Sequence, residues 1–259
     1  MAGQRGAAGL GALPEDALLE VLALVPARDL VRSCRLVCTQ WRAVADRPSL
    51  WKRKCEREGL APAARPPPPD WRVWYFLCRL RRNLLRNPRA EEKLKHWRLD
   101  SNEGDEWKVE GLPGTHGNSF PGAGVRKYFV TSYGLCLKSQ LIDLKKEGYW
   151  EELMDKHRPD IIISDWYAAR FDCGCQYQLK VQLLSADHLV LEEFCPQPVI
   201  IDQWSDAKWK EMSYTFHNYK PGVRYILFKH GGQDTQYWAG WYGIRVTNSS
   251  ITIGPGTSA

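Results

Sequence analysis

The segment from His230 to Gly243 concentrates the side chains of this chain that are best suited to binding a ligand. It reads HGGQDTQYWAGWYG, and Tyr237, Trp238, Trp241 and Tyr242 lie close together within it. The flanking glycines predict a strand, a tight turn and a second strand. A large aromatic face beside polar groups can stack on a pyranose ring, and Trp238 is the candidate for that contact. Periodicity alone favours another use, in which a second sheet of the same domain covers these rings.

Catalytic motifs are not recognisable elsewhere in the sequence. The six histidines are scattered, and we find no nucleophile elbow, zinc-protease motif or phosphate-binding loop. Acidic residues are too numerous for a glycosidase pair to be identified by counting. Cys173 and Cys175 lack a second cysteine pair or nearby histidines at zinc spacing. We therefore predict a binding module with no catalytic residues, no metal and no cofactor.

Length and composition indicate two modules in one chain. A sequence of 259 residues can hold one small domain and one sandwich of ordinary size. It contains no apolar run long enough to span a bilayer, and its N-terminus carries acidic residues where a secretory signal needs an apolar centre. We expect a cytoplasmic protein with no membrane span, whose eight cysteines are free thiols.

Positive charge gathers in the middle of the chain. Residues 61–98 carry 10 basic and 3 acidic side chains, mainly in the run RLRRNLLRNPR from Arg79 to Arg89. Such a run could contact an acidic partner or nucleic acid, although the solvated face of a helix is its commoner use. No aromatic platform is interleaved with these arginines, so we predict no nucleic-acid partner.

The first sixty residues have helical periodicity. Pro14 and the acidic pair after it open one helix, and Pro26 ends it. A second helix is expected from Asp29 to Trp41, with Val37 in its buried stripe, and a third begins near Pro48. Three short helices bury only a small core, so we expect a partner to complete this domain.

This order of residues resembles an F-box over residues 10–56. The resemblance rests on Leu13-Pro14, Val25-Pro26-Ala27, the run CRLVCTQWR from Cys34 to Arg42, and Leu50-Trp51. It implies docking onto the Skp adaptor of a Skp–cullin–F-box ubiquitin ligase. The apolar positions that the resemblance assigns to the adaptor are Leu13, Pro14, Leu18, Leu19, Val25 and Leu30.

A proline-rich stretch follows the helical region. APAARPPPPDW, from Ala61 to Trp71, predicts a semi-rigid spacer between modules. The next segment predicts a helix whose apolar side extends to Leu84. We assign residues 57–98 to the linker with its basic helix, and residues 1–9 to a flexible N-terminus.

From about Glu106 the periodicity changes from helix to strand. CQYQLKVQLL, from Cys175 to Leu184, alternates apolar and polar residues, and similar short runs recur with turn residues between them. One helical insert is expected from Lys146 to Asp155. These features predict an antiparallel β-sandwich of jelly-roll type over residues 99–259, with ligand-binding loops at one end. The fold class is therefore α+β multidomain, in which a helical F-box and a linker helix precede the sandwich.

The sandwich region resembles the F-box-associated domain of the sugar-recognising F-box proteins over most of residues 71–254. The resemblance rests on GYWEELMD, DWYAAR, GVRYILFKHGGQDTQYWAGWYG and RVTNSS. It implies binding of the inner chitobiose core of high-mannose N-glycans on misfolded glycoproteins exported from the endoplasmic reticulum, which are then presented for ubiquitination. The positions that match the family's sugar-binding residues are Tyr133, Asp172, Tyr237 and Trp238.

The sequence departs from the family's glycan-binding pattern at two positions. Ala239 stands in place of a lysine and Tyr133 in place of a phenylalanine, so we expect weaker or more selective glycan binding. A different interpretation is a ligase receptor or scaffold that recognises a protein surface and buries Trp238 and Trp241 in its core. A weaker one, RNA stacking on the aromatic loop, predicts a steep salt dependence of binding.

Overall fold

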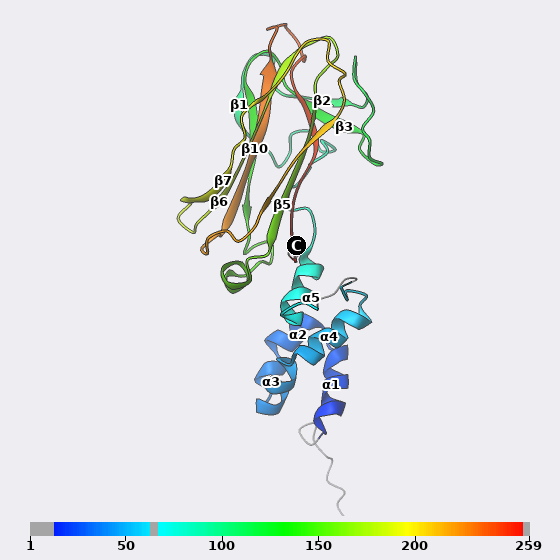
Figure 1. The fold of residues 1–259 in the computed structure, drawn as a ribbon, viewed down its shortest axis with the longest axis vertical. Helices are drawn as coiled ribbons and strands as arrows, with labels where there is room; N and C mark the ends of the chain where they lie inside the picture. Colours follow the sequence, from blue (N-terminus) through cyan, green and yellow to red (C-terminus); the bar gives the residue numbers. More distant parts are fainter. Residues whose placement is uncertain (1–12, 63–66, 256–259) are drawn as a thin grey trace, which may run out of the picture. The chain divides into compact units, whose positions relative to one another are not determined.

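The protein forms two compact units in a computed structural model that describes residues 13–62 and 67–255 (Figure 1). The first unit comprises residues 1–79 and the second residues 80–259. Their boundary, between Arg79 and Leu80, falls inside the span 57–98 that the sequence assigns to a linker. Each unit has a core of its own.

The first unit is a bundle of short helices. Leu18, Leu22 and Trp51 are buried at its centre, and the indole nitrogen of Trp51 donates to the carbonyl oxygen of Ala45 at 2.9 Å. This hydrogen bond gives a partner to the only polar atom of the buried Trp51 side chain. The helices are α1 (Glu15–Leu24), α2 (Ala27–Arg32), the 3-10 turn η2 (Cys34–Leu36), α3 (Thr39–Ala45), α4 (Pro48–Arg57) and α5 (Trp71–Leu80).

The prediction of one continuous helix from Asp29 to Trp41 is wrong, because the chain breaks twice in that span. Cys38 has an extended backbone, and its thiol accepts the N–H of Trp41 at 3.5 Å, which caps a new helix. Val37 therefore lies in the connection between the two helical segments and is exposed, although the periodic pattern predicted that it is buried.

Helix α5 ends earlier than its apolar pattern predicts. It stops at Leu80, and Leu84 belongs to the second unit, where its N–H donates to the carbonyl oxygen of Ile251 at 2.8 Å. Asn83 binds the same strand through two hydrogen bonds, to Ser249 and Ile251. Residues 81–84 thus follow a strand of the second unit and do not prolong a helix.

The second unit is a β-sandwich of jelly-roll type. Its six-stranded sheet has the order β1-β4-β10-β6-β7, with β8 paired to β6, and its five-stranded sheet has the order β2-β3-β11-β5-β9; all pairs are antiparallel. The strands are β1 (Arg98–Asn102), β2 (Lys108–Gly111), β3 (Lys127–Val130), β4 (Cys136–Asp143), β5 (Asp160–Ala168), β6 (Cys175–Leu184), β7 (Val190–Phe194), β8 (Val199–Ile201), β9 (Lys210–Phe216), β10 (Tyr225–Asp234) and β11 (Arg245–Gly254).

The two sheets pack face to face around aromatic rings and a buried polar network. Tyr177 of β6 stacks on Tyr167 of β5 with ring centroids 4.2 Å apart. Asp165 of β5, which is fully buried, accepts the hydroxyl of Tyr177 and lies 2.6 Å from Nδ1 of His230 on β10. On the other side of the imidazole, Nζ of the buried Lys138 lies 2.5 Å from Nε2. Burial without a full set of counter-charges lowers the pKa of His230 to about 4 and that of Lys138 well below its usual range.

Two predictions about loops and helices in this unit are wrong. The tight turn and second strand predicted between Gly231 and Gly243 are absent: Gly231 and Gly232 continue β10 to Asp234, and residues 235–244 form one long loop. The helical insert starts later than Lys146, because Gly148 has a φ of +99° and supports a turn. Helical structure occupies residues 151–157, with a π-helical part at η3 (Leu153–His157).

Candidate functional site

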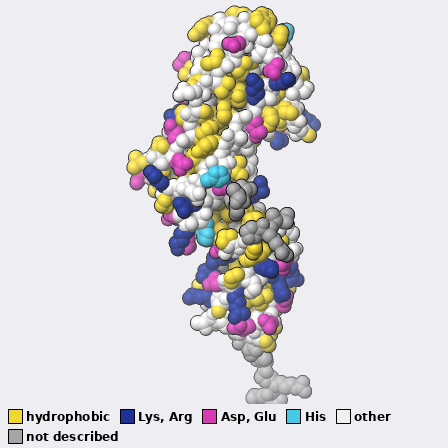
Figure 2. All heavy atoms as spheres, viewed as in Figure 1, with side chains coloured by type: hydrophobic (Ala, Val, Ile, Leu, Met, Phe, Trp, Pro, Cys, Tyr) yellow, Lys and Arg dark blue, Asp and Glu magenta, His cyan; other side chains and the backbone are white. Residues whose placement is uncertain are grey.

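One end of the sandwich carries loops that are held together by backbone hydrogen bonds. We call residues 103–107, 131–135, 169–174, 202–209 and 235–244 the loop cluster. The N–H of Asp234 donates to the carbonyl oxygen of Ser132 at 2.9 Å, and the N–H of Thr235 donates to that of Gly174 at 3.0 Å. The arrow of β10 in Figure 1 points to this end, where Figure 2 shows hydrophobic atoms at the surface. These contacts fix the long loop after β10 against its neighbours.

The loop after β10 turns two aromatic rings outward. Tyr237 has a φ of +57° and is 70% exposed, and its N–H is bound by the carboxylate of Asp234 at 2.5 Å. Trp238 is 39% exposed and meets Tyr242 edge to face at a centroid distance of 5.4 Å. A supported indole with one open face is suited to stacking on a flat apolar ligand surface.

Trp241 has a different environment from Trp238. Its indole nitrogen donates to the carbonyl oxygen of Asp105 at 3.0 Å, and its ring packs against the cluster around Tyr128 and Trp209. The ammonium group of Lys108 covers the ring at 3.9 Å from its centroid. Packing therefore accounts for Trp241, whereas Trp238 is not part of the core.

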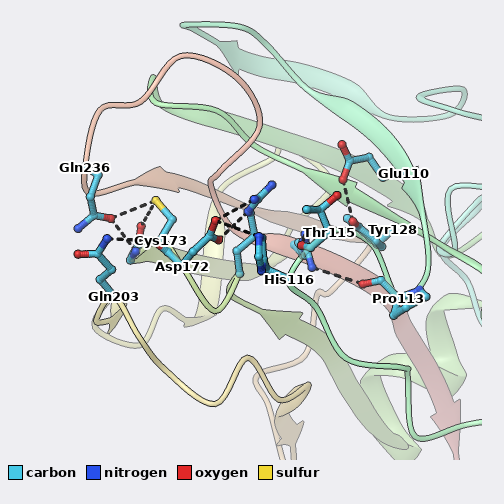
Figure 3. A network of polar contacts seen from close by, with 12 residues as sticks. Glu110, Pro113, Thr115, His116, Tyr128, Asp172, Cys173, Gln203 and Gln236 are labelled. Atoms are coloured by element: carbon cyan, nitrogen blue, oxygen red, sulfur yellow. Dashed lines mark hydrogen bonds and ion pairs between the residues drawn. The ribbon is translucent and has the colours of Figure 1, made fainter.

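Asp172 lies beside this loop and is held as a carboxylate. Arg170 donates to both of its oxygens, at 2.9 and 3.0 Å, and these bonds hold the pKa of Asp172 below its usual range. Figure 3 shows Asp172 between Cys173 on one side and His116 on the other, whose imidazole lies 3.8 Å from the carboxylate. Each carboxylate oxygen has a further lone pair available, so the group can accept hydrogen bonds from a ligand.

Gln236 fixes the distance between the Asp172 loop and the Trp238 loop. Its side-chain oxygen accepts the N–H of Gly174 at 2.6 Å and the thiol of Cys173 at 3.1 Å (Figure 3). The sequence analysis did not identify this residue, since an isolated glutamine carries no motif. Its contact makes the two candidate sugar-binding loops one rigid surface.

Tyr133 lies on the loop between β3 and β4 and is half-buried. The residue before it, Ser132, accepts the N–H of Asp234, and the residue after it, Gly134, packs so closely on Gly104 that an added Cβ would come 2.5 Å from a backbone nitrogen. The structure therefore brings Tyr133 into the same loop cluster as the other three candidate sugar-binding residues.

The candidate adaptor-binding residues of the first unit differ in exposure. Leu18, Leu19 and Leu30 are buried in its core and leave almost no side-chain surface exposed. Pro14 is exposed. The half-buried members of the set are Leu13 and Val25. Large apolar side chains that the motif did not select are exposed on the same unit, namely Val21, Leu24, Leu36 and Val37.

Within residues 13–62 and 67–255, no three histidine, cysteine, aspartate or glutamate side chains gather in a way that could hold a metal ion. In the same part of the chain, no helix combines the length and apolar character needed to cross a membrane. All eight cysteines are free.

Comparisons with protein families match both units. The model of the F-box-associated region matches residues 75–253, and an F-box-like model matches residues 10–57. The chain belongs to the F-box-associated family. It is an F-box protein, a substrate receptor of a Skp–cullin–F-box ubiquitin ligase.

Curated relatives of this F-box protein align over nearly its whole length. F-box only protein 6 of Bos taurus is 65% identical over 93% of this chain and 91% of its own length. F-box only protein 44 of Homo sapiens is 62% identical over 94% of this chain and 96% of its own. F-box only protein 2 of Bos taurus is 50% identical over 98% of this chain and 86% of its own.

Proposed function

We propose that this receptor binds the chitobiose core of high-mannose N-glycans on misfolded glycoproteins and presents them for ubiquitination and endoplasmic-reticulum-associated degradation. One observation supports the proposal most strongly. Trp238 is 39% exposed on a loop that Gln236 bonds to the loop of Asp172, whose carboxylate is ionised. An aromatic face next to a fixed acceptor matches the two sides of a pyranose ring, one of C–H groups and one of hydroxyl and amide groups.

Each residue of the candidate site has a separate role in this proposal. Trp238 stacks on the C–H side of a sugar ring, and Asp172 accepts hydrogen bonds from its hydroxyl or N-acetyl groups. Tyr237 and Tyr133 form walls with polar tips. Ala239, which is exposed, supplies no polar contact. Since a neutral hydrogen bond contributes only about 1 kcal/mol net, stacking on Trp238 provides much of the affinity.

The first unit connects this site to the ligase. We propose that it docks on the Skp adaptor through Leu13, Pro14 and Val25, together with Leu24, which directly precedes Val25 and is exposed. Leu18, Leu19 and Leu30 form the core beneath them. Through the adaptor the receptor joins a cullin ligase, which performs the ubiquitin chemistry, so the receptor itself needs no catalytic residue, metal or cofactor. The complex acts in the cytoplasm, where exported glycoproteins become accessible.

Calorimetric titration with a free high-mannose N-glycan tests glycan recognition. The wild-type chain is expected to bind, Trp238→Ala to lose at least tenfold in affinity, and Leu189→Ala to bind as the wild type does. Leu189 is a matched control because it is exposed in the turn between β6 and β7, at the other end of the strands. A folded wild-type chain that binds no glycan would favour the alternative, a ligase receptor that recognises a protein surface.

A further inference from the structure

Two more aromatic rings are exposed in the loop cluster, beside the candidate sugar site. Phe171 is 46% exposed and Trp204 is 63% exposed. Their rings meet edge to face with centroids 5.5 Å apart, and the N–H of Trp204 donates to the carbonyl oxygen of Phe171 at 2.9 Å. We call these two residues the aromatic pair. The pair presents apolar surface to solvent from two different loops.

The backbone under the aromatic pair is held in an uncommon conformation. Trp204 has a φ of +68°, a region that bulky residues rarely occupy. The neighbouring Gln203 fixes the loop by donating its side-chain amide to the carbonyl oxygen of Asp172 at 3.0 Å. Gly174 leaves room for this loop, since a Cβ there would lie 2.9 Å from the carbonyl oxygen of Ile201 and 3.0 Å from the nitrogen of Gln203. An exposed ring on a strained and well-anchored backbone is typical of a binding residue.

The aromatic pair is continuous with the candidate sugar site. Phe171 directly precedes Asp172, whose carboxylate is the proposed sugar acceptor. Gln236 of the Trp238 loop and Gln203 of the Trp204 loop both bind the loop that carries Asp172, at Gly174 and at Asp172 respectively (Figure 3). A ligand that contacts Asp172 therefore reaches a loop that also carries Phe171 and that is bonded to the loop of Trp204.

Polar side chains beside the aromatic pair already have partners. The amide of Gln203 is bound to the Asp172 carbonyl, and the hydroxyl of Ser205 accepts the N–H of Ala207. A sugar ring needs converging polar groups around an aromatic face, whereas an apolar side chain needs only the face. The chitobiose core is the part of an N-glycan that is joined to asparagine, so polypeptide lies within reach of any site that holds that core.

We propose that Phe171 and Trp204 bind an apolar side chain of the client polypeptide next to its glycosylated asparagine. This inference rests on the proposed glycan recognition and extends it. A native glycoprotein buries such side chains, and a misfolded one exposes them. The receptor then binds two features of one client, the sugar through Trp238 and the unfolded polypeptide through the aromatic pair. Because both features belong to the same molecule, the second contact raises the overall affinity for the client.

Three probes that carry the same high-mannose N-glycan separate these contributions: the free glycan, a glycopeptide with leucine and phenylalanine beside the asparagine, and one with serine and glycine there. The full chain is titrated with each. We expect the wild type to bind the apolar glycopeptide about tenfold more tightly than the polar one. Trp204→Ala and, independently, Phe171→Ala should remove this advantage and leave the affinity for the free glycan unchanged.

Controls distinguish failure of the inference from failure of glycan recognition. Trp238→Ala should weaken binding of all three probes, and Leu189→Ala should weaken none; thermal unfolding checks that each variant folds. Equal binding of the two glycopeptides by the wild type, or an unchanged preference in both aromatic-pair variants, would overturn the inference alone. A loss of free-glycan affinity in Trp204→Ala would overturn it in favour of a sugar contact. A wild-type chain that binds none of the probes would refute glycan recognition and the inference with it.

Discussion

Two tryptophans in the loop after β10, Trp238 and Trp241, have different roles. Trp238 has an open face, whereas Trp241 donates its indole N–H to Asp105 and packs beneath Lys108. We expect Trp238→Ala to reduce glycan affinity at least tenfold with little change in stability. Trp241→Ala should lower the free energy of unfolding by about 2 kcal/mol. Urea unfolding beside glycan titration checks both; a stability loss confined to Trp238→Ala would contradict this assignment.

Asp172 should contribute to glycan binding independently of pH between pH 8 and pH 5. Since the bonds from Arg170 hold the pKa of its carboxyl below 3.8, the group keeps its charge throughout the range from pH 8 to pH 5. The contribution of Asp172 to glycan affinity should therefore be constant over this range, and Asp172→Asn should weaken binding at every pH in it. Titrations at pH 5, 6.5 and 8 test this. A contribution that disappears at pH 5 would show that the carboxylate takes up a proton there.

His230 makes the stability of the sandwich depend on pH. Its pKa falls from the usual 6.5 to about 4 because the ring is buried between Asp165 and Lys138, so the folded state binds its proton less readily than the unfolded chain. Its contribution to stability is complete above pH 6.5 and is lost as the pH falls toward 4, by about 3 kcal/mol in total. Urea unfolding from pH 7 to pH 4 should show this decline, and His230→Asn should flatten it. An equal slope in the variant would assign the decline to other groups.

The exposure of single residues could be predicted only in part from the sequence. The family resemblance selected Tyr133, Asp172, Tyr237 and Trp238, and the structure brings all of them into one loop cluster. Periodicity alone could not separate Trp238 from Trp241, because both lie outside any strand and their burial depends on loops far away in the sequence. The resemblance also did not distinguish buried adaptor positions, such as Leu18, from accessible ones.

Strand β10 depends on two glycines where its neighbours approach most closely. A Cβ on Gly232 would lie 1.7 Å from the carbonyl oxygen of Gln176 on β6, and one on Gly231 would lie 2.0 Å from that of Cys136 on β4. We expect Gly232→Ala to destabilise the sandwich by about 3 kcal/mol or more, because the clash is with the backbone of Gln176 and β10 is held between β4 and β6. Gly124→Ala is the matched control in the same unit, since Gly124 also has a positive φ, but the nearest atom to its Cβ position is Nη1 of Arg89 at 3.7 Å. Equal losses in the two variants would refute the steric explanation.

Elements with strong local signals were predicted well, and those set by long-range contacts were not. The alternating pattern of β6 and the proline-bounded helix α1 both matched the structure. Gly231 and Gly232 favoured a turn in the sequence because glycine is common in turns. Glycine is also needed in a strand whose neighbours approach closely, and only the neighbouring strands show that this is its role here. The short strand β8 has no local pattern, and it exists because it pairs with the first three residues of β6, Cys175 to Tyr177.

At the scale of the whole molecule, the two units have separate binding tasks. In the first unit, Leu18, Leu22 and Leu30 form the core, and other apolar side chains remain exposed. Leu24 is 67% exposed at the end of α1. We expect Leu24→Lys to weaken adaptor capture at least tenfold without unfolding the unit, because a cation suits the end of a helix. Leu22→Ala should instead lower the unfolding temperature. Undiminished capture by folded Leu24→Lys would place the adaptor elsewhere.

Assembly of the three partners tests the central claim most directly. Immobilised Skp adaptor is loaded with the full chain and then with a fluorescent high-mannose N-glycan, and both the retained chain and the retained glycan are measured. The account predicts that the wild type retains both, that Trp238→Ala retains the chain but loses the glycan, and that Leu24→Lys retains neither. Retention of glycan by the Trp238→Ala complex at the wild-type level, or a wild-type complex that retains the chain without the glycan, would contradict it.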